Sequence, residues 1–377
     1  MTTTAETVTP RIVIPPELRP SDGRFGSGPS KVRPEAVEAL AARARDYLGT
    51  SHRQQGVRAI VAGIRRGLSE LFSLPDGYEV VLGNGGTTVF WDCMVFSLIE
   101  RRSQHLVFGE FSGKFAEAVA AAPHLTSPDV IESEPGTHPM PVPRPDIDLY
   151  ALTHNETSTG VAMPVRRVAP GSFVVVDATS AAAGLPVDPA EFDVYYFAPQ
   201  KGFASDGGLW VALCSPAAIE RIESIAVSGR YVPPSLDLKI ALDNARQDQT
   251  YNTPALATLF LMIEQIDWLL ANGGLAFSTA RCERSAAIVY RWAEASSYAR
   301  PFVSDPAQRS NVVATIDFEG VDATTVARVL RANGIVDTEP YRKLGRNQLR
   351  IALYPAIDPE DVEALTACID HVVERLD

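Results

Sequence analysis

Hydrophobic and polar positions follow two patterns along this chain, and each pattern predicts a different kind of element. Short apolar runs rich in β-branched and aromatic residues predict buried strands at residues 79–82, 105–108, 147–153, 172–177, 193–198 and 208–214. Apolar residues at helical spacing predict helices at residues 34–47, 57–73, 216–227 and 255–270. Strands that are apolar throughout and alternate with helices indicate an α/β fold with a largely parallel sheet covered on both faces.

The pattern changes after residue 273, where we place a domain boundary. Residues 272–274, Asn-Gly-Gly, would end the preceding helix. An α+β pattern then follows, with helices at 275–297, 321–333 and 358–376 and strands at 311–318 and 348–354. The sequence therefore predicts an extended, Thr- and Pro-rich segment at 1–22, a large domain at 23–273 and a small α+β domain at 274–377. Residues 230–248 are expected to be irregular.

The composition is that of an ordinary globular protein, with 46% hydrophobic and 21% charged residues. The net charge of −12 argues against nucleic acid or an anionic membrane as a partner. No apolar run approaches the roughly 20 residues of a membrane span, and the N-terminus lacks a secretory signal, so we expect a cytoplasmic protein. Four cysteines without CxxC spacing and six histidines without HxxxH pairing predict no disulfide frame and no metal site.

Lys201 lies between two predicted buried strands, 193–198 and 208–214. An isolated lysine there would be read as part of a simple loop, but apolar surroundings also favour a neutral amine that can react with an aldehyde. Asp177 argues for the second interpretation, because it ends the preceding strand, 172–177. An aspartate that keeps a pyridinium nitrogen protonated and a lysine that holds an aldehyde together suit pyridoxal 5'-phosphate (PLP).

A glycine-rich turn that contains Gly86, Thr87 and Thr88 joins the strand 79–82 to a following helix. Backbone N–H groups and the helix dipole at such a turn can hold an anion. The turn is not a P-loop, because no GK[ST] follows, and its glycines do not fit GxGxxG. Upstream of Asp177 and Lys201, it suits the phosphate of PLP.

Four further places carry candidate side chains, each with a simpler alternative. Phe111 is either core or a plate that stacks on a cofactor ring. Ser27 lies in a glycine-bearing loop that is either a plain turn or approaches a ligand. His52 and Arg53 lie in a polar connector that is either surface or an anion site. Arg350 begins an apolar strand, where an arginine usually binds a carboxylate through two hydrogen bonds.

These residues stand in motifs that resemble the phosphoserine aminotransferase family in its longer actinobacterial form. In chain order the motifs are GRFGSGPSKV, TSHRQ, NGGTTVFWD, GEFSGKFAEA, HNETSTG, VVDATS, YYFAPQKGFASDGGLW, QTYNTPA and GIVDTEPYRKLGRNQLRIALYPA. The resemblance covers the chain from about residue 20 to its end. It implies a class V aminotransferase of PLP fold type I that works in the cytoplasm as a homodimer with shared active sites.

The resemblance also implies a reaction and its substrates. The family exchanges the amino group between L-glutamate and 3-phosphohydroxypyruvate, giving O-phospho-L-serine and 2-oxoglutarate in serine biosynthesis. In some bacteria a related step serves pyridoxine biosynthesis. Family members hold PLP through a lysine and an aspartate, which match Lys201 and Asp177 here.

Further site residues follow from the resemblance, motif by motif. The remaining cofactor-binding positions are Gly86, Thr87, Thr88, Phe111, Thr157, Gln200, Asn252 and Thr253. Phe111 stands where the family has a larger tryptophan, and many relatives have an arginine in the turn of Thr87 and Thr88. Asn252 and Thr253 would reach the PLP phosphate of the other subunit.

The substrate-binding positions implied in the same way are Ser27, His52, Arg53, Arg342, Lys343 and Arg350. Residues 341–343, Tyr-Arg-Lys, replace a distal His-Arg pair of the family, so either Arg342 or Lys343 is a candidate for the substrate phosphate. One site has to accept both a γ-carboxylate and a phosphate ester, and mobile cations suit that requirement.

Other functions remain alternatives at this point. A serine- or alanine-type class V aminotransferase acting on glyoxylate or pyruvate has substrates without a distal anion, and would leave the cations at His52, Arg53, Arg342 and Lys343 unused. A cysteine desulfurase needs a cysteine on a mobile loop, and Cys368 lies in a predicted helix. A catalytically inactive relative is opposed by the intact pair of Lys201 and Asp177.

Overall fold

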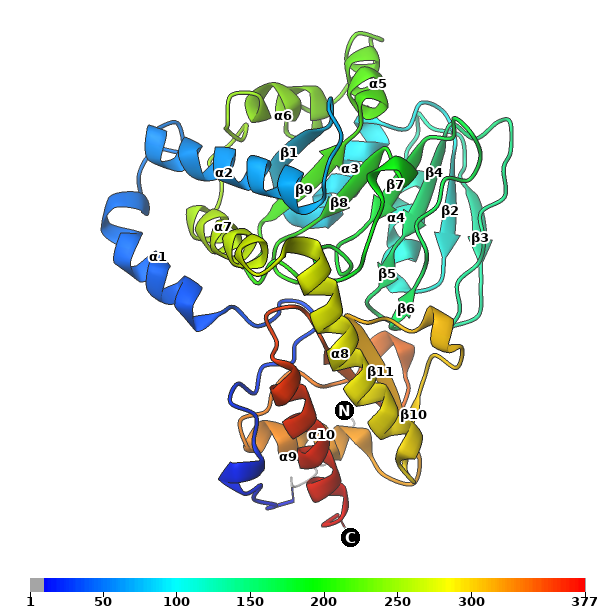
Figure 1. Ribbon diagram of the computed structural model, residues 1–377. Helices are drawn as coiled ribbons and strands as arrows, with labels where there is room; N and C mark the ends of the chain where they lie inside the picture. The colour runs from blue at the N-terminus through cyan, green and yellow to red at the C-terminus, as the bar shows by residue number, and fades with distance from the viewer. Residues whose placement is uncertain (1–9, 377) are drawn as a thin grey trace, which may run out of the picture.

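The computed structural model describes residues 10–376, which form a larger unit and a smaller unit connected through the long helix α8 (Gly274–Ala295) (Figure 1). Within these residues the larger unit contains a seven-stranded sheet in the order β1-β9-β8-β7-β4-β2-β3. The strands, in that order, are Glu79–Asn84, Leu209–Cys214, Val194–Phe197, Val174–Asp177, Leu149–Thr153, Ser103–Val107 and Asp129–Glu132. Strand β9 is antiparallel to both neighbours and the other pairs are parallel, so the predicted mostly parallel sheet is confirmed.

Helices cover both faces of this sheet because successive strand residues point to opposite sides. On β8, Tyr195 packs into one core together with helices α2 (Gln55–Leu71) and α7 (Leu256–Ala271). Its neighbour Tyr196 packs into the other core, which contains residues of helices α3 (Gly86–Ser97), α4 (Glu110–Ala120), α5 (Pro216–Ala226) and α6 (Leu238–Ala245). Helix α1 (Pro34–Tyr47) packs against α7 at one side of the unit (Figure 1).

The smaller unit is an antiparallel sheet in the order β10-β11-β12, packed with α8, α9 and α10. Its strands are Ala299–Pro301, Val313–Phe318 and Gln348–Ala352, and helices α9 and α10 are Ala323–Ala332 and Pro359–Val373. A two-stranded ribbon of β5 (Asn155–Glu156) and β6 (Val161–Ala162) follows β4. The ribbon lies against the smaller unit, because Thr315 Oγ1 donates to the carbonyl of Thr159 at 2.8 Å.

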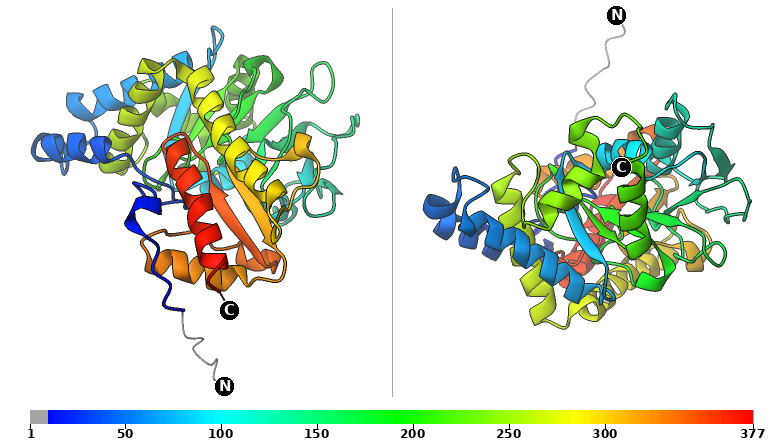
Figure 2. Two further views of the ribbon diagram at one scale, coloured as in Figure 1. Left: turned by 60° about the horizontal axis from the view of Figure 1, so that its bottom comes forward. Right: turned by 90° about the horizontal axis from the view of Figure 1, so that it is seen from above.

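The N-terminal segment runs along the smaller unit, although the two are far apart in the sequence (Figure 2, left). Ile14 N donates to Asn333 Oδ1 at 2.9 Å, and Phe25 N donates to Val336 O at 3.2 Å. The predicted extended segment at 1–22 lies partly outside the described residues, and a 3-10 turn at Pro16–Leu18 interrupts the rest. The division of the chain at residues 22 and 273 stays a prediction.

Three elements differ from the sequence prediction. Helix α6 lies in the stretch expected to be irregular, and it buries one narrow face through Leu238, Ala241, Leu242 and Ala245. Helix α4 follows β2 directly, and β3 is an edge strand whose residues are only half buried or exposed. Because α4 and α6 are short and β3 is largely exposed, none of them has a long apolar signature.

Two findings apply to the part of the chain that the structure describes. No helix there is both long and apolar enough to span a membrane. No cluster of three or more histidine, cysteine, aspartate or glutamate side chains there is arranged to bind a metal ion. All four cysteines are buried free thiols.

Candidate active site

A cavity of about 380 Å³ lies between the two units, at the carboxyl ends of the parallel strands. This edge is where open α/β sheets bind ligands. Strands β7 and β8 are neighbours in register, so the residues that follow them enter the same space. Nine of the predicted site residues line the cavity: Ser27, Thr87, Thr88, Phe111, Thr157, Asp177, Gln200, Lys201 and Arg350.

Lys201 is buried in this cavity, just beyond the end of β8. Its Nζ donates to Thr157 Oγ1 at 2.8 Å and lies 5.4 Å from the centre of the Phe111 ring. Burial lowers the pKa of Lys201 to about 8, although the negative charge of Asp177 acts in the opposite direction. The backbone of Gly28 passes so close that a Cβ there would lie 2.8 Å from Lys201 Cε. Lys201 is therefore a confined amine that can lose its proton near neutral pH.

Asp177 ends β7 and is buried on the same cavity wall. Thr179 donates to its Oδ1 through both the backbone N–H, at 2.9 Å, and the side-chain hydroxyl, at 2.6 Å. Trp91 Nε1 lies 3.4 Å from Oδ2. Burial raises the pKa of Asp177, whereas these donors and Lys201 stabilise its ionised form. The structure thus keeps donors on both oxygens of a buried carboxyl group.

The glycine-rich turn brings the start of helix α3 to the cavity. Gly85 has a φ of 109°, which favours glycine, and the helix begins at Gly86 with no side-chain cap. Thr87 and Thr88 line the cavity, while Gly86 is half buried beside it. The uncapped backbone N–H groups of this first turn are available to an anion.

Arg350 reaches the cavity from the smaller unit and is the third residue of β12, where the sequence places it at the start of the apolar run. Its Nη1 donates to Thr157 O at 3.3 Å, and its buried Nε has no partner among the described residues. Ser27 Oγ and Gln200 Oε1 are also buried without a partner there. Unpaired buried polar atoms around one cavity indicate a bound ligand.

Arg342 and Lys343 lie outside this cavity, in the 3-10 turn Arg342–Leu344. They line a neighbouring hollow of about 680 Å³, which shares Ser27 and Arg350 with the cavity. Both side chains are exposed. Lys343 Nζ forms an ion pair with Glu110 at the start of α4, so Lys343 already has an anionic partner.

Four predicted residues, His52, Arg53, Asn252 and Thr253, do not line the cavity of their own chain. His52 follows α1 and its Nδ1 lies 3.2 Å from Thr253 Oγ1, so two of the predicted segments meet each other. Thr253 O accepts a hydrogen bond of 3.2 Å from Asn84 Nδ2 at the end of β1. Arg53, Asn252 and Thr253 are exposed. They form a polar surface group next to the glycine-rich turn.

The sequence pattern of the family described as aminotransferase class-V matches residues 142–365, which include Asp177, Lys201 and Arg350. The chain belongs to the class V aminotransferases. It is 62% identical to the phosphoserine aminotransferase of a Nocardioides species, over 98% of this chain and 100% of that protein. The solved phosphoserine aminotransferase of Cytophaga hutchinsonii covers 94% of this chain and 98% of its own, with a TM-score of 0.86 and 25% identity.

A PLP-bound phosphoserine aminotransferase from Trichomonas vaginalis has the same fold, with a TM-score of 0.79 at 19% identity over 93% of this chain and 99% of its own. The predicted PLP fold type I is therefore confirmed. Class V aminotransferases depend on PLP, and the cavity of this chain fits the cofactor. It combines a buried amine, a buried carboxylate with donors on both oxygens, and an uncapped helix start.

Half of the residues that line the cavity of this aminotransferase were not among the predicted site residues, and Trp91 and Tyr341 are the two large aromatic ones. Trp91 lies in the apolar helix α3, where its ring carries no sign of a role beyond packing. Tyr341 belongs to a basic segment of the sequence, in which the cations draw attention first. The one signal that could have found it is its position next to the predicted substrate-binding cations.

Proposed function

We propose that the protein is a phosphoserine aminotransferase. It transfers the amino group between L-glutamate and 3-phosphohydroxypyruvate, giving O-phospho-L-serine and 2-oxoglutarate in serine biosynthesis. One observation carries the proposal: Lys201, Asp177 and Arg350 meet in one cavity of a chain that is 62% identical to a phosphoserine aminotransferase over its whole length.

The chemistry assigns a task to each of these side chains. When bound, PLP supplies an electron-withdrawing ring that stabilises the negative charge left by removal of the amino acid's α-proton. Lys201 Nζ would hold the cofactor at its aldehyde carbon until the amino group of the substrate takes its place. The released, neutral amine would then take the α-proton and return it. Its lowered pKa makes the neutral form accessible near pH 8. Asp177 would present a negative charge to the ring nitrogen, and Phe111, Thr157 and Gln200, which line the same cavity, would orient the ring.

Substrate anions require cations at two places. We propose that Arg350 binds the α-carboxylate, because its buried Nε is unpaired and carboxylates bind the edge of a guanidinium through two hydrogen bonds. Ser27 lines the same cavity. For the distal carboxylate or phosphate, we propose Arg342, an exposed cation in the adjoining hollow, together with His52 and Arg53. Lys343 can join them only by leaving Glu110.

We also propose a homodimer in which each subunit completes the site of the other. Support comes from the polar group of His52, Arg53, Asn252 and Thr253, which does not line the cavity of its own chain. In the family, Asn252 and Thr253 correspond to residues that reach the partner's PLP phosphate. Three further points are proposed from the family resemblance. The enzyme works in the cytoplasm and has a second role in pyridoxine biosynthesis. Its chain divides into a large domain at 23–273 and a small domain at 274–377.

A panel of keto acids tests the reaction. Purified enzyme loaded with PLP is given glutamate as donor and 3-phosphohydroxypyruvate, glyoxylate or pyruvate as acceptor, and 2-oxoglutarate is measured. We expect the highest kcat/KM with 3-phosphohydroxypyruvate, and no turnover in the Lys201→Ala control. A higher kcat/KM with glyoxylate or pyruvate would replace this proposal by the serine- or alanine-type alternative.

A further inference from the structure

Tyr341 forms part of the wall between the active-site cavity and the neighbouring hollow, and it lines both. Its ring centre lies 5.9 Å from that of Phe111, with the two planes tilted by 57°. Arg350 also lies over the ring of Tyr341, with its Cζ 5.2 Å from the ring centre. One tyrosine from the smaller unit therefore contacts an aromatic residue of α4 and the proposed carboxylate-binding arginine.

The contact with Tyr341 matters because Arg350 has few other partners. Among residues 10–376, no aspartate or glutamate forms an ion pair with it, and its Nη1 makes a single hydrogen bond, to the carbonyl of Thr157 at 3.3 Å. A guanidinium attracted to a ring face keeps its N–H groups, which lie in the plane of the group, free for other acceptors. Tyr341 can therefore fix the guanidinium without using the donors that a carboxylate needs.

An ion pair lies close to Tyr341 along the chain. Lys343, two residues later, pairs with Glu110, the first residue of α4 and the neighbour of Phe111 in the chain. The pair joins the turn Arg342–Leu344 of the smaller unit to the larger unit, and places Tyr341 beside Phe111. The ring of Tyr341 thus lies between Phe111 of the larger unit and Arg350 of the smaller unit.

We propose that Tyr341 is a positioning residue for Arg350, which it holds through its ring face in the orientation that binds the α-carboxylate common to every substrate. The inference deepens the proposed function and rests on its assignment of Arg350. It requires the ring of Tyr341 and not its hydroxyl group. The effect should therefore appear in the binding of all substrates alike and leave the chemical step unchanged.

The test compares Tyr341→Leu, which removes the ring, with Tyr341→Phe, which keeps it. Both are studied as PLP-loaded enzyme, with circular dichroism as a check of folding. We expect Tyr341→Leu to raise KM for glutamate and 3-phosphohydroxypyruvate about three- to tenfold, as loss of a partly buried cation–π contact predicts. The kcat should change less than twofold, and Tyr341→Phe should behave as wild type.

A second readout does not depend on turnover. The dissociation constant of 2-oxoglutarate, measured from the cofactor's absorbance, should rise by the same factor in Tyr341→Leu. In a double-mutant cycle with Arg350→Met, the leucine change should cause no further loss. Equal losses in Tyr341→Phe and Tyr341→Leu, or independent effects in the cycle, would overturn the inference.

The same experiment separates this inference from the proposed function. If the wild type transfers glutamate's amino group to glyoxylate or pyruvate in preference to 3-phosphohydroxypyruvate, the proposed substrate is wrong. The cycle between Tyr341 and Arg350 still tests positioning in that case, because every amino acid and keto acid substrate carries an α-carboxylate. If the substrate is right and the cycle shows no coupling, the inference alone fails.

Discussion

Trp91 donates its indole N–H toward Asp177: Nε1 lies 3.4 Å from Asp177 Oδ2 and 3.1 Å from the hydroxyl oxygen of Tyr196. All three side chains are buried. The indole thus links a residue of β8 to the carboxylate at the end of β7. Because burial raises the pKa of Asp177, a donor on this oxygen helps to keep the carboxylate charged where the cofactor's ring nitrogen needs it.

We predict that Trp91→Phe weakens PLP binding by up to about tenfold. Phenylalanine keeps an aromatic ring against Phe115 but removes the donor, and a hydrogen bond to a charged group contributes roughly 1.5 kcal/mol at the weak end of the range. The measurement is a titration of enzyme freed of cofactor with PLP, followed by absorbance. Phe115→Leu, which changes the packing and leaves the N–H in place, serves as the control. Unchanged PLP affinity in Trp91→Phe would show that the 3.4 Å contact between Trp91 and Asp177 contributes nothing to PLP binding.

The lowered pKa of Lys201 predicts an unusual pH dependence for the enzyme freed of cofactor. Only the neutral amine reacts with electrophiles, and the neutral fraction rises as pH passes the pKa. The rate at which an amine-specific reagent labels Lys201, followed by mass spectrometry, should therefore reach half its maximum near pH 8. An ordinary lysine would do so near pH 10.4.

Two substitutions should move this midpoint in opposite directions. Asp177 raises the pKa of Lys201, so Asp177→Asn should shift the midpoint to lower pH. Arg350 lowers that pKa, so Arg350→Met should shift it to higher pH. A midpoint near that of exposed lysines in the wild type and in both variants would mean that burial does not control the pKa of Lys201.

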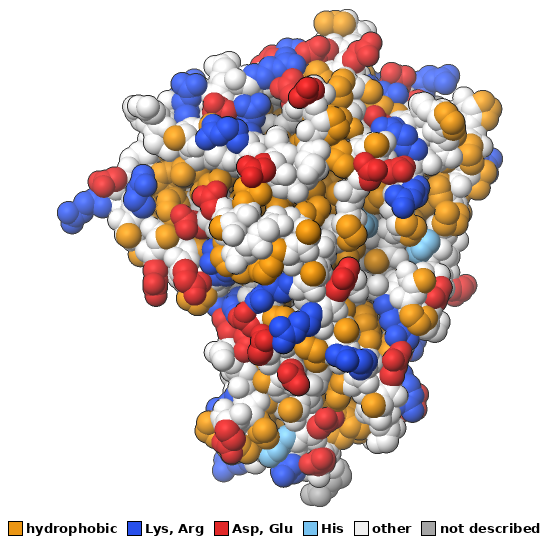
Figure 3. Space-filling view, in the orientation of Figure 1, with side chains coloured by type: hydrophobic (Ala, Val, Ile, Leu, Met, Phe, Trp, Pro, Cys, Tyr) orange, Lys and Arg blue, Asp and Glu red, His pale blue; other side chains and the backbone are white. Residues whose placement is uncertain are grey.

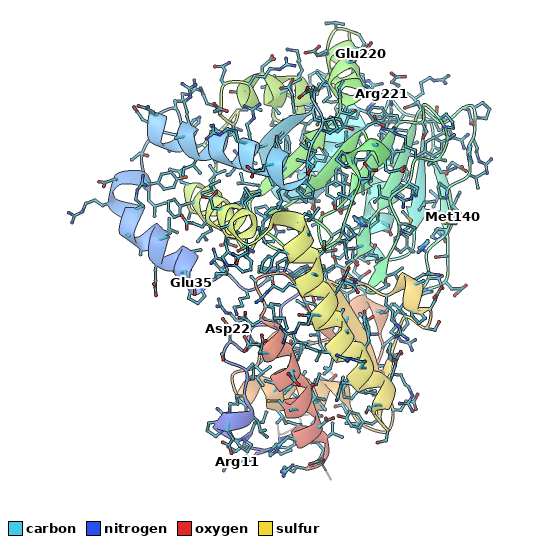
Figure 4. The ribbon with its side chains drawn as sticks, viewed as in Figure 1. Arg11, Asp22, Glu35, Met140, Glu220 and Arg221 are labelled. Carbon is cyan, nitrogen blue, oxygen red and sulfur yellow. The ribbon has the colours of Figure 1, made fainter. Side chains whose placement is uncertain are left out.

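Lys31 connects the glycine-bearing loop of Ser27 to the smaller unit. It is 5% exposed, and its Nζ lies 3.1 Å from Asp358, 3.6 Å from Asp361 and 3.7 Å from Asp22. Figure 4 shows Asp22 at the junction of the two units, and Figure 3 shows charged side chains gathered there. Ser30, the residue before Lys31, is also held in place, because its backbone N–H donates to the carbonyl of Gln200 at 2.9 Å.

We predict that Lys31→Met lowers the free energy of unfolding by about 3 kcal/mol, because removal of the lysine leaves the buried carboxylate of Asp361 without a cation. Asp361 is the most affected, since it is 4% exposed. Urea denaturation measures the change. Lys31→Met combined with Asp361→Asn should recover part of the loss, and Arg284→Met, at an exposed ion pair with Glu360, should change stability little. A loss below about 1 kcal/mol would show that water solvates the carboxylate that Lys31→Met leaves unpaired.

The fold was predictable where apolar runs were continuous. Six of the seven strands of the central sheet lie within a few residues of their predicted positions. The order of Asp177 and Lys201 along the chain placed them together because β7 and β8 are adjacent. Helix α6 and strand β3 were missed because a narrow or half-exposed face leaves a weak pattern. Asp358 is the N-cap residue of α10, but its carboxylate pairs with Lys31 and Arg281 and makes no cap hydrogen bond.

The candidate site was predictable only where one residue's chemistry is distinctive. A lysine and an aspartate at the ends of buried strands are costly to bury without a chemical role, whereas the role of Trp91 depends on the direction of one N–H in a helix that looks like core. Tyr341 meets Arg350 through the packing of a turn against a strand of the same small unit, and meets Phe111 across the two units. No local pattern contains such a contact.

The last prediction concerns sharing of sites between subunits. His52 and Thr253 lie together on the surface beside the glycine-rich turn and outside their own cavity, so in the proposed dimer they serve the partner's site. Lys201→Ala and an Asn252→Ala/Thr253→Ala double variant should each be nearly inactive as pure dimers.

After subunit exchange, a hybrid dimer of these two variants has one site with both defects and one site with neither, because the two defects then lie on the same shared site. Random exchange gives hybrids in half of the dimers, each with one of its two sites intact, so recovery should approach a quarter of wild-type activity. Native mass spectrometry with a size-tagged subunit measures the hybrid fraction. If hybrids form and activity does not return, each chain builds its site alone and the shared-site proposal fails.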